Sequence, residues 1–199
     1  MYLSKFLKFG VFALALTGSY SVMADSIRSW IKAVPPTLLD GTPWVDAATA
    51  HDLDPWLLYA ITLEESGILD VNGGILRPWP YQLHINGKKL RFDTRQEAAE
   101  QIEKWEMAGI RNYDIGPLQI NRRWHGHRVD HPSDLLNVTR SLHLAAYILA
   151  ETLQVSGADT ELGIGRYRSW REPTARAYAK RIQDIRIQLP EYSDALIHH

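Results

Sequence analysis

The chain has 199 residues, of which 22 are Lys or Arg and 23 are Asp or Glu; 45% are apolar and none is cysteine. This length and composition fit one globular domain and exclude an intrinsically disordered chain. The missing thiol excludes a disulfide scaffold, a zinc ribbon and a cysteine nucleophile, and the near-neutral charge argues against a nucleic acid partner.

The first 24 residues have the pattern of a secretory signal peptide. Two lysines precede an apolar run over residues 9–17, and Val22 and Ala24 occupy the two positions that a signal peptidase reads. The run is too short to cross a bilayer comfortably, so we expect cleavage rather than a retained anchor. Cleavage would leave residues 25–199 with 20 basic and 23 acidic side chains, a net charge of −3. We therefore expect a periplasmic protein with no stable membrane insertion.

Helical patterns dominate the remaining sequence. Asp54 followed by Pro55 predicts a helix start, and this helix should run from Trp56 to about Ser66, where Gly67 ends it. Three further helices are predicted by a capping box and by apolar stripes that we assign to the core: one from Thr94 to Gly109, one carrying Leu142, Ala146, Leu149 and Leu153 up to Gly157, and one from Pro173 with Tyr178, Ile182 and Ile185 facing inward.

A β-hairpin interrupts this helical pattern. Asn86-Gly87 is a preferred two-residue turn, and the register that it imposes over 81–92 pairs Tyr81 with Phe92 and Leu83 with Leu90. One face of the hairpin would then be apolar. The other face, which carries Gln82, His84, Lys89 and Arg91, would be polar and could line a groove.

Two adjacent glutamates, Glu64 and Glu65, end the first predicted helix after an apolar run. Burial and the negative end of the helix dipole both disfavour a charged carboxylate, and the raised pKa that results suits a general acid. Two solvated glutamates at a frayed helix end are the alternative. Helical spacing cannot choose between the two residues, since each shares a face with Ile61 and a leucine.

Polar amides are embedded among apolar residues over 112–121. Gln119 lies between a leucine and an isoleucine and would need hydrogen-bond partners if buried. It therefore either lines a groove that reads sugar hydroxyls or caps the next helix. Over residues 163–170, small residues interrupt a helix and leave the hydroxyl of Tyr167 close to Trp170.

Four short motifs occur in a fixed order along residues 50–182: Glu65-Ser66, Gly-Pro-Leu-Gln-Ile at 116–120, Asn137 ahead of an alanine-rich helix, and Gly-Arg-Tyr-Arg-Ser at 165–169. This order resembles the soluble lytic transglycosylase domain, which has a goose-type lysozyme-like fold. The Pro-Trp-Pro and Asn-Gly hairpin within 78–98 resembles a subgroup with a hairpin inserted between the first two motifs. The resemblance implies an α+β, predominantly helical, lysozyme-like fold with a small β-hairpin insertion, forming one domain over residues 25–199.

The resemblance also implies roles for individual residues. The catalytic acid of the family directly precedes a serine, which selects Glu65 over Glu64. Substrate-binding roles are implied for Ser66, Leu118, Gln119, Asn121 and Tyr167, with the Tyr167 hydroxyl close to the acid. Two departures concern the groove floor: Pro117-Leu118 stands where Leu-Met is usual, and Arg168 stands where Asn or His is common.

The implied reaction is lytic transglycosylation of peptidoglycan glycan strands. Glu65 would protonate the β-1,4 bond between N-acetylmuramic acid and N-acetylglucosamine and then take the proton of the C6 hydroxyl, which closes on C1 as a 1,6-anhydro sugar. This chemistry requires neither a metal nor a cofactor. Proteins of this subgroup often accompany secretion or conjugation machinery, which is the partner that the resemblance implies.

Two other functions remain open. A lysozyme-type hydrolase would need Asp70 or Asp114 to hold a water, and a non-catalytic peptidoglycan-binding module would have its groove closed by the departures at Pro117 and Arg168. The nature of the products, or their absence, would separate these alternatives.

Clusters of histidine and basic residues have plainer interpretations. His125-Gly126-His127, with His131 nearby, predicts a loop rather than a zinc site, and His198-His199 predicts a solvated tail. The basic residues of the last helix predict a solvated face; they are Arg176, Lys180, Arg181 and Arg186.

Overall fold

The structure, a computed structural model, describes residues 39–69 and 76–197, all within one contact unit of the chain. The predicted signal peptide at 1–24, Asp70 and the terminal histidine pair lie outside the described residues. Within residues 39–69 and 76–197, no helix has both the length and the apolar character needed to cross a membrane.

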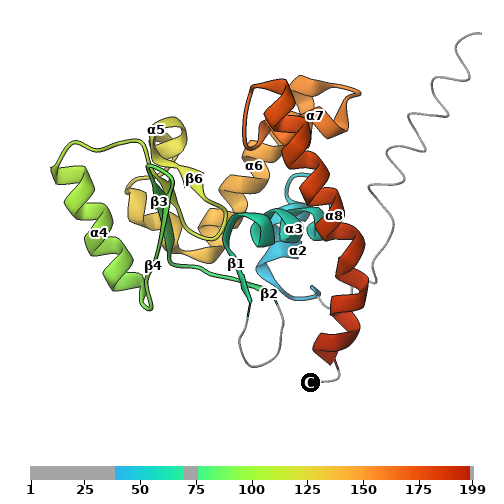
Figure 1. Cartoon of the computed structure of the whole chain (residues 1–199), viewed down its shortest axis with the longest axis horizontal. Coiled ribbons are helices and arrows are strands. Elements are labelled where there is room, and N and C mark those ends of the chain that lie inside the picture. Colours follow the sequence, from blue (N-terminus) through green and yellow to red (C-terminus); the bar gives the residue numbers. More distant parts are fainter. Residues whose placement is uncertain (1–38, 70–75, 198–199) are drawn as a thin grey trace, which may run out of the picture. The chain divides into compact units, whose positions relative to one another are not determined.

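The fold is α+β and predominantly helical, as predicted. The helices are distributed along the whole described chain, and small antiparallel sheets lie between them (Figure 1). The four helices predicted from the sequence are α3, α4, α6 and α8. The helical elements are α2 (Pro43–Thr49), α3 (Pro55–Ser66), α4 (Arg95–Met107), α5 (Arg122–His125), η2 (Gly126–Arg128), η3 (Pro132–Leu136), α6 (Val138–Ser156), α7 (Thr160–Arg166) and α8 (Glu172–Ile197).

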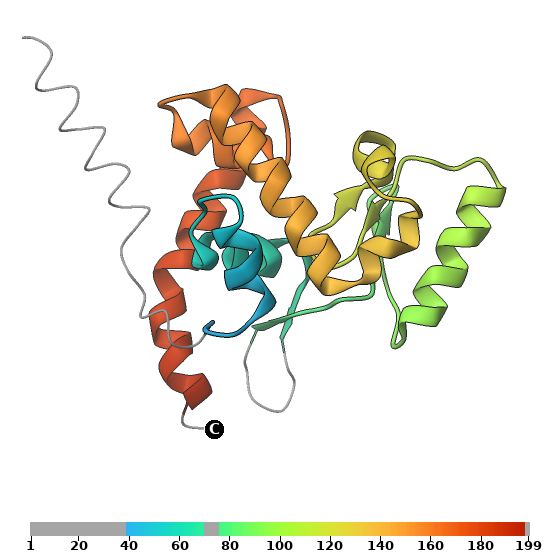
Figure 2. The same ribbon diagram turned by 180° about the vertical axis from the view of Figure 1, so that it is seen from behind.

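Local capping explains where the central helix α3 begins. The Asp54 side chain accepts a hydrogen bond from the backbone N–H of Trp56, and Pro55 occupies the first turn, where its missing N–H costs nothing. Helix α3 is apolar on nearly every side, with Leu58 and Ile61 fully buried. It is enclosed by α2, by α8 and by strands β1 (Gly67–Leu69) and β2 (Leu76–Pro78), so its C-terminal end lies inside the protein (Figure 2).

The predicted hairpin forms with its predicted register, as strands β3 (Gln82–Ile85) and β4 (Lys88–Arg91), with Leu83 opposite Leu90. The predicted open polar face is wrong at Gln82, which is fully buried. The reason is that the Gln82 side chain faces the end of α3, where its amide donates a hydrogen bond to the backbone oxygen of Glu65. Strand β3 is also an inner strand. It pairs with β5 (Asp114–Ile115), which pairs with β6 (Ile120–Asn121), in a sheet of order β4-β3-β5-β6.

Helix α8 differs from its predicted solvated basic face at one residue. Arg186 is buried and forms an ion pair with Asp54, the residue that caps α3. Arg176, Lys180 and Arg181 remain at least 40% exposed, as predicted. Arg186 therefore anchors the C-terminal half of α8 to the start of α3 rather than contributing to a basic surface.

A close backbone approach positions α8 against α7. A Cβ atom on Gly165 would lie 2.2 Å from the carbonyl oxygen of Ala175, so the glycine is what allows α7 and α8 to meet.

The predicted loop around His125 is wrong, because α5 and η2 form there. The Asn121 side chain starts α5 by accepting hydrogen bonds from the backbone N–H groups of Arg123 and Trp124.

Candidate active site

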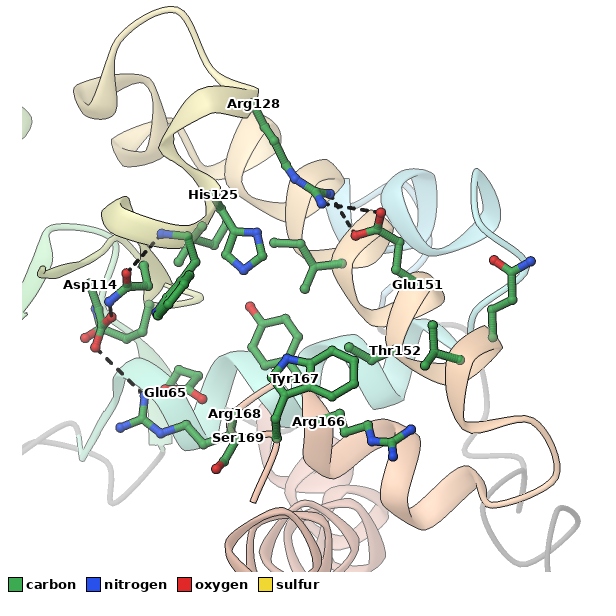
Figure 3. Close-up of a pocket in the computed structure, with 18 residues that line it drawn as sticks. Glu65, Asp114, His125, Arg128, Glu151, Thr152, Arg166, Tyr167, Arg168 and Ser169 are labelled. Atoms are coloured by element: carbon green, nitrogen blue, oxygen red, sulfur yellow. Dashed lines mark hydrogen bonds and ion pairs between the residues drawn. The ribbon is translucent and has the colours of Figure 1, made fainter. Parts of the chain in front are cut away.

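Glu65 lies in the last turn of α3, where it separates two cavities. Its side chain is buried, at 8% exposure, yet it lines both a cavity of about 860 Å³ and a smaller one of about 120 Å³. Gln119 and Arg168 also line both cavities. Figure 3 shows the larger cavity with Glu65 at its edge and Arg168 beside it.

Burial dominates the electrostatics of Glu65. Desolvation raises its pKa from 4.5 to about 7, against the lowering effects of the Arg168 cation and of a hydrogen bond from Tyr178. The Tyr178 hydroxyl donates to Oε1 at 2.8 Å, and the Arg168 guanidinium lies 3.8 Å from Oε2. The negative charges of Asp114 and Glu64 raise the pKa further. Glu65 can therefore hold a proton at neutral pH and release it within the working range of a general acid.

The neighbouring Glu64 has a different environment, which separates the two residues that helical spacing could not. Glu64 forms an ion pair with Arg181, with 2.5 Å between its Oε1 and the arginine Nε. Glu65 instead accepts its hydrogen bond from a neutral phenol. Of the two residues, Glu65 is thus the one whose protonation is set by burial.

A rigid polar floor connects Glu65 to the segment 114–121. The Gln82 amide donates to the backbone oxygen of Glu65 at 2.9 Å, and Gln119 donates to the backbone oxygens of Gln82 and Gly116 at 3.1 and 2.8 Å. Gln119 has a φ of 47°, a left-handed conformation that is strained for a side chain of this size. Gly116 has a φ of 77°, and a Cβ there would lie 2.3 Å from the Leu135 carbonyl oxygen. The floor is therefore held in one conformation by short-range constraints.

A second carboxylate, that of Asp114, faces the same cation as Glu65. Its Oδ2 lies 3.0 Å from Nδ1 of His84 and 3.9 Å from the Arg168 guanidinium, and its Oδ1 accepts from the Asn121 amide at 2.7 Å. Because Nη1 of Arg168 lies 3.8 Å from Glu65, the two carboxylates are separated by at most the sum of the two distances, about 7.7 Å. The site thus pairs a protonatable carboxyl with a firmly held carboxylate.

The larger cavity extends from Glu65 between α6, α7 and the α5 segment. It includes an ion pair, Arg128 with Glu151, at 2.8 Å, and two exposed indoles, Trp124 at 63% and Trp170 at 66% exposure. In Figure 3 the Arg128–Glu151 pair lies at the end away from Glu65. Exposed aromatic rings beside charged and amide groups are typical of surfaces that bind sugars, whose rings have apolar faces and polar edges.

The predicted substrate-binding residues divide into two groups. Gln119, Asn121 and Tyr167 line the larger cavity. Leu118 and Ser66 are fully buried and line neither cavity; the Ser66 hydroxyl donates to the Thr62 carbonyl oxygen at 3.2 Å. The Tyr167 hydroxyl donates to the Leu118 carbonyl oxygen at 2.9 Å rather than to the acid. Leu118 thus contributes to the site through its backbone.

Sequence reasoning missed the tyrosine that contacts the acid. The apolar stripe of α8 predicts Tyr178 as a core residue, and it is buried there, but its hydroxyl reaches Glu65. The only sequence signal for this contact is a phenol hydroxyl on the otherwise apolar, inward-facing stripe of α8. His84 was placed on the polar face of the hairpin, and only the β3–β5 pairing brings it to Asp114.

The charges around Glu65 predict two opposite shifts in the pH dependence of activity. A general acid must be protonated, so kcat/KM should fall as pH rises through about 7. Arg168→Met removes a cation that lowers the Glu65 pKa, so this alkaline limb should move to higher pH. Asp114→Asn removes a charge that raises the pKa, so the limb should move to lower pH. Profiles of kcat/KM between pH 5 and 9 measure both shifts, and limbs that moved in the same direction would contradict this account.

No protein-family model matches the chain, and neither the curated proteins nor the solved structures include a significant match. Among the residues that the structure describes, no group of three or more His, Asp or Glu side chains is arranged to hold a metal ion.

Proposed function

We propose that the protein is a peptidoglycan lytic transglycosylase with Glu65 as its catalytic acid. The observation that carries the proposal is a buried carboxyl, with a pKa raised to about 7, at the edge of a cavity of about 860 Å³ that displays two exposed indoles. The order of the four sequence motifs adds the substrate class. The cavity also argues against a groove closed by Arg168, the basis of the non-catalytic alternative.

In the proposed reaction, Glu65 protonates the glycosidic oxygen as the bond to C1 breaks, so the leaving sugar departs with a hydroxyl group. Positive charge develops at C1 and its ring oxygen, and the held carboxylate of Asp114 adds a negative charge to this region of the site. The Glu65 carboxylate then accepts the C6 hydroxyl proton while the C6 oxygen bonds to C1. The acid is regenerated and no water is consumed.

The Tyr178 side chain would assist this proton transfer without exchanging a proton itself. The hydrogen bond from Tyr178 stabilises the carboxylate form of Glu65, and burial stabilises the acid form, so the two states lie close in free energy near neutral pH. Burial also raises the Tyr178 pKa well above 10, which keeps its hydroxyl as a permanent donor.

A muramidase is the second candidate, and the position of Asp114 is the observation that favours it. Two-carboxylate glycosidases place their carboxyl groups roughly 5–9.5 Å apart, and the bound of about 7.7 Å keeps Glu65 and Asp114 below the upper end of this range. In such an enzyme Asp114 would act as nucleophile or would activate a water. The same two residues therefore allow two reactions. The C6 hydroxyl attacks C1 in the transglycosylase, whereas Asp114 or a water attacks C1 in the muramidase.

Mass spectrometry of the products from purified sacculi tests the proposal. We expect soluble muropeptides that end in 1,6-anhydro-N-acetylmuramic acid. Reducing ends would identify a hydrolase. Binding to sacculi without any soluble product would favour the non-catalytic binding module and would overturn both enzymatic functions.

The proposed substrate determines where the protein would act. Peptidoglycan is an extracytoplasmic polymer, which is consistent with export through the predicted signal peptide to the periplasm. Local opening of the wall would serve a secretion or conjugation apparatus, the partner that the sequence resemblance suggests. Cell fractionation with and without residues 1–24 tests the location.

A further inference from the structure

The smaller cavity beside Glu65 differs in charge from the larger one. Its volume of about 120 Å³ is a seventh of that of the larger cavity, so it suits a small group rather than a sugar chain. Three cations from three separate elements line it: Lys89 from β4, Arg168 from the segment after α7, and Arg181 from α8. Among the described residues that line it, the carboxylates are Glu64 and Glu65.

These charges do not cancel one another. Arg181 is neutralised by Glu64, which it contacts at 2.5 Å. Burial raises the pKa of Glu65 to about 7, so its carboxyl is neutral in about half of the molecules at pH 7 and in most of them at lower pH. Within the described part of the chain, the Lys89 ammonium group has no hydrogen bond and no ion pair, whereas its backbone pairs with that of His84. Arg168 meets carboxylates only at 3.8 and 3.9 Å, so its N–H groups are not committed to hydrogen bonds. The cavity is thus lined by an unpaired lysine and by an arginine whose N–H groups remain available, although its charge is shared with Glu65 and Asp114.

We propose that Lys89 and Arg168 form a subsite for a carboxylate of the peptide stem of peptidoglycan. This inference rests on the proposed function and adds a determinant of specificity to it. The stem peptides are the part of the substrate that carries free carboxylates, whereas the uncharged N-acetyl sugars of the strand need no cation. The guanidinium can bind a carboxylate through two parallel hydrogen bonds, and the ammonium adds a third.

The inserted hairpin is what supplies the lysine. Lys89 lies opposite His84 in the β3–β4 pairing, and both line the smaller cavity. Lys88, its neighbour on the same strand, lines neither cavity. Successive side chains of a strand point to opposite faces, so the two lysines are a matched pair that differs in direction but not in charge.

The test compares two substrates: glycan strands that carry intact peptide stems, and the same strands after carbodiimide-activated coupling to ammonia has converted the stem carboxylates into amides. The readout is the ratio of kcat/KM for the first over the second. Lys89→Gln should lower this ratio about tenfold, the loss expected for a charge-assisted contact. Lys88→Gln should leave the ratio at the wild-type value. Because each ratio compares two substrates of one variant, a general loss of folded protein cancels.

The outcomes separate this inference from the proposed function. If the wild type releases no product from either substrate, the proposed function fails, and the inference fails with it. If the wild type is active but Lys89→Gln and Lys88→Gln give the same ratio, the carboxylate subsite alone is overturned. An equal loss on both substrates in Lys89→Gln would also overturn it, since the lysine would then act on the glycan.

Discussion

Replacing Glu65 with glutamine is expected to reduce the release of soluble muropeptides from sacculi by at least about a hundredfold. Glutamine keeps the shape of the side chain and can still accept the hydrogen bond from Tyr178, but it can neither donate a proton to the glycosidic oxygen nor accept one from the C6 hydroxyl. General acid–base groups typically contribute about 10²- to 10⁴-fold to a rate. Mass spectrometric quantification of anhydromuropeptides measures the loss, and circular dichroism checks that the variant is folded.

Glu64→Gln provides the matched control for this experiment. Glu64 is the adjacent carboxylate on the same helical turn, but it is already paired with Arg181. We expect this variant to remain within about tenfold of the wild type, in keeping with the modest energy of a partly exposed ion pair. A larger loss in Glu64→Gln than in Glu65→Gln would show that Glu64 is the acid and that the assignment to Glu65 is wrong.

Local signals explain why much of the fold could be predicted from the sequence. Helix α3 begins where Asp54 can cap it, and α4 begins at the capping box formed by Thr94 and Glu97. The hairpin follows from Asn86, which adopts a φ of 50° in the tight turn together with Gly87. In each case the residues that determine the boundary are within a few positions of it, so no knowledge of tertiary contacts is needed.

The environment of the acid could not be predicted in the same way, because it depends on contacts between distant segments. Tyr178 is 113 positions from Glu65, and Arg186 is 132 positions from Asp54. Gln82 is buried, and its amide contacts the backbone of Glu65 at the end of α3, 17 positions earlier in the chain. Alternation along the hairpin specifies which residues share a face, but it does not specify whether another element covers that face.

The same distinction explains the placement of Ser66 and Leu118. Their positions beside Glu65 and Gln119 follow from chain order, but the orientation of each side chain follows from packing. Both side chains are fully buried, so the backbone of Leu118, through Tyr167, links the floor of the larger cavity to the segment after α7. A motif in a sequence therefore marks the location of a site more reliably than it marks the side chains that face a ligand.

Glu65→Gln is also expected to make the protein more stable than the wild type at alkaline pH. The Glu65 pKa is about 7 in the folded protein against an ordinary value of 4.5, so the folded state binds the proton more tightly than the unfolded state. The wild type therefore keeps its full stability below pH 4.5 and loses part of it as pH rises through 7. This difference between the folded and unfolded pKa corresponds to about 3 kcal/mol.

Glutamine does not titrate, so the variant escapes this loss. The free energy of unfolding of Glu65→Gln, relative to that of the wild type, should rise by about 3 kcal/mol between pH 4 and pH 8.5. Urea denaturation at the two pH values measures it, with Glu64→Gln as the control for removing a carboxyl group at this helix end. A difference that did not change with pH would show that Glu65 is not buried as an acid, and the basis for its catalytic role would be lost even if the variant were inactive.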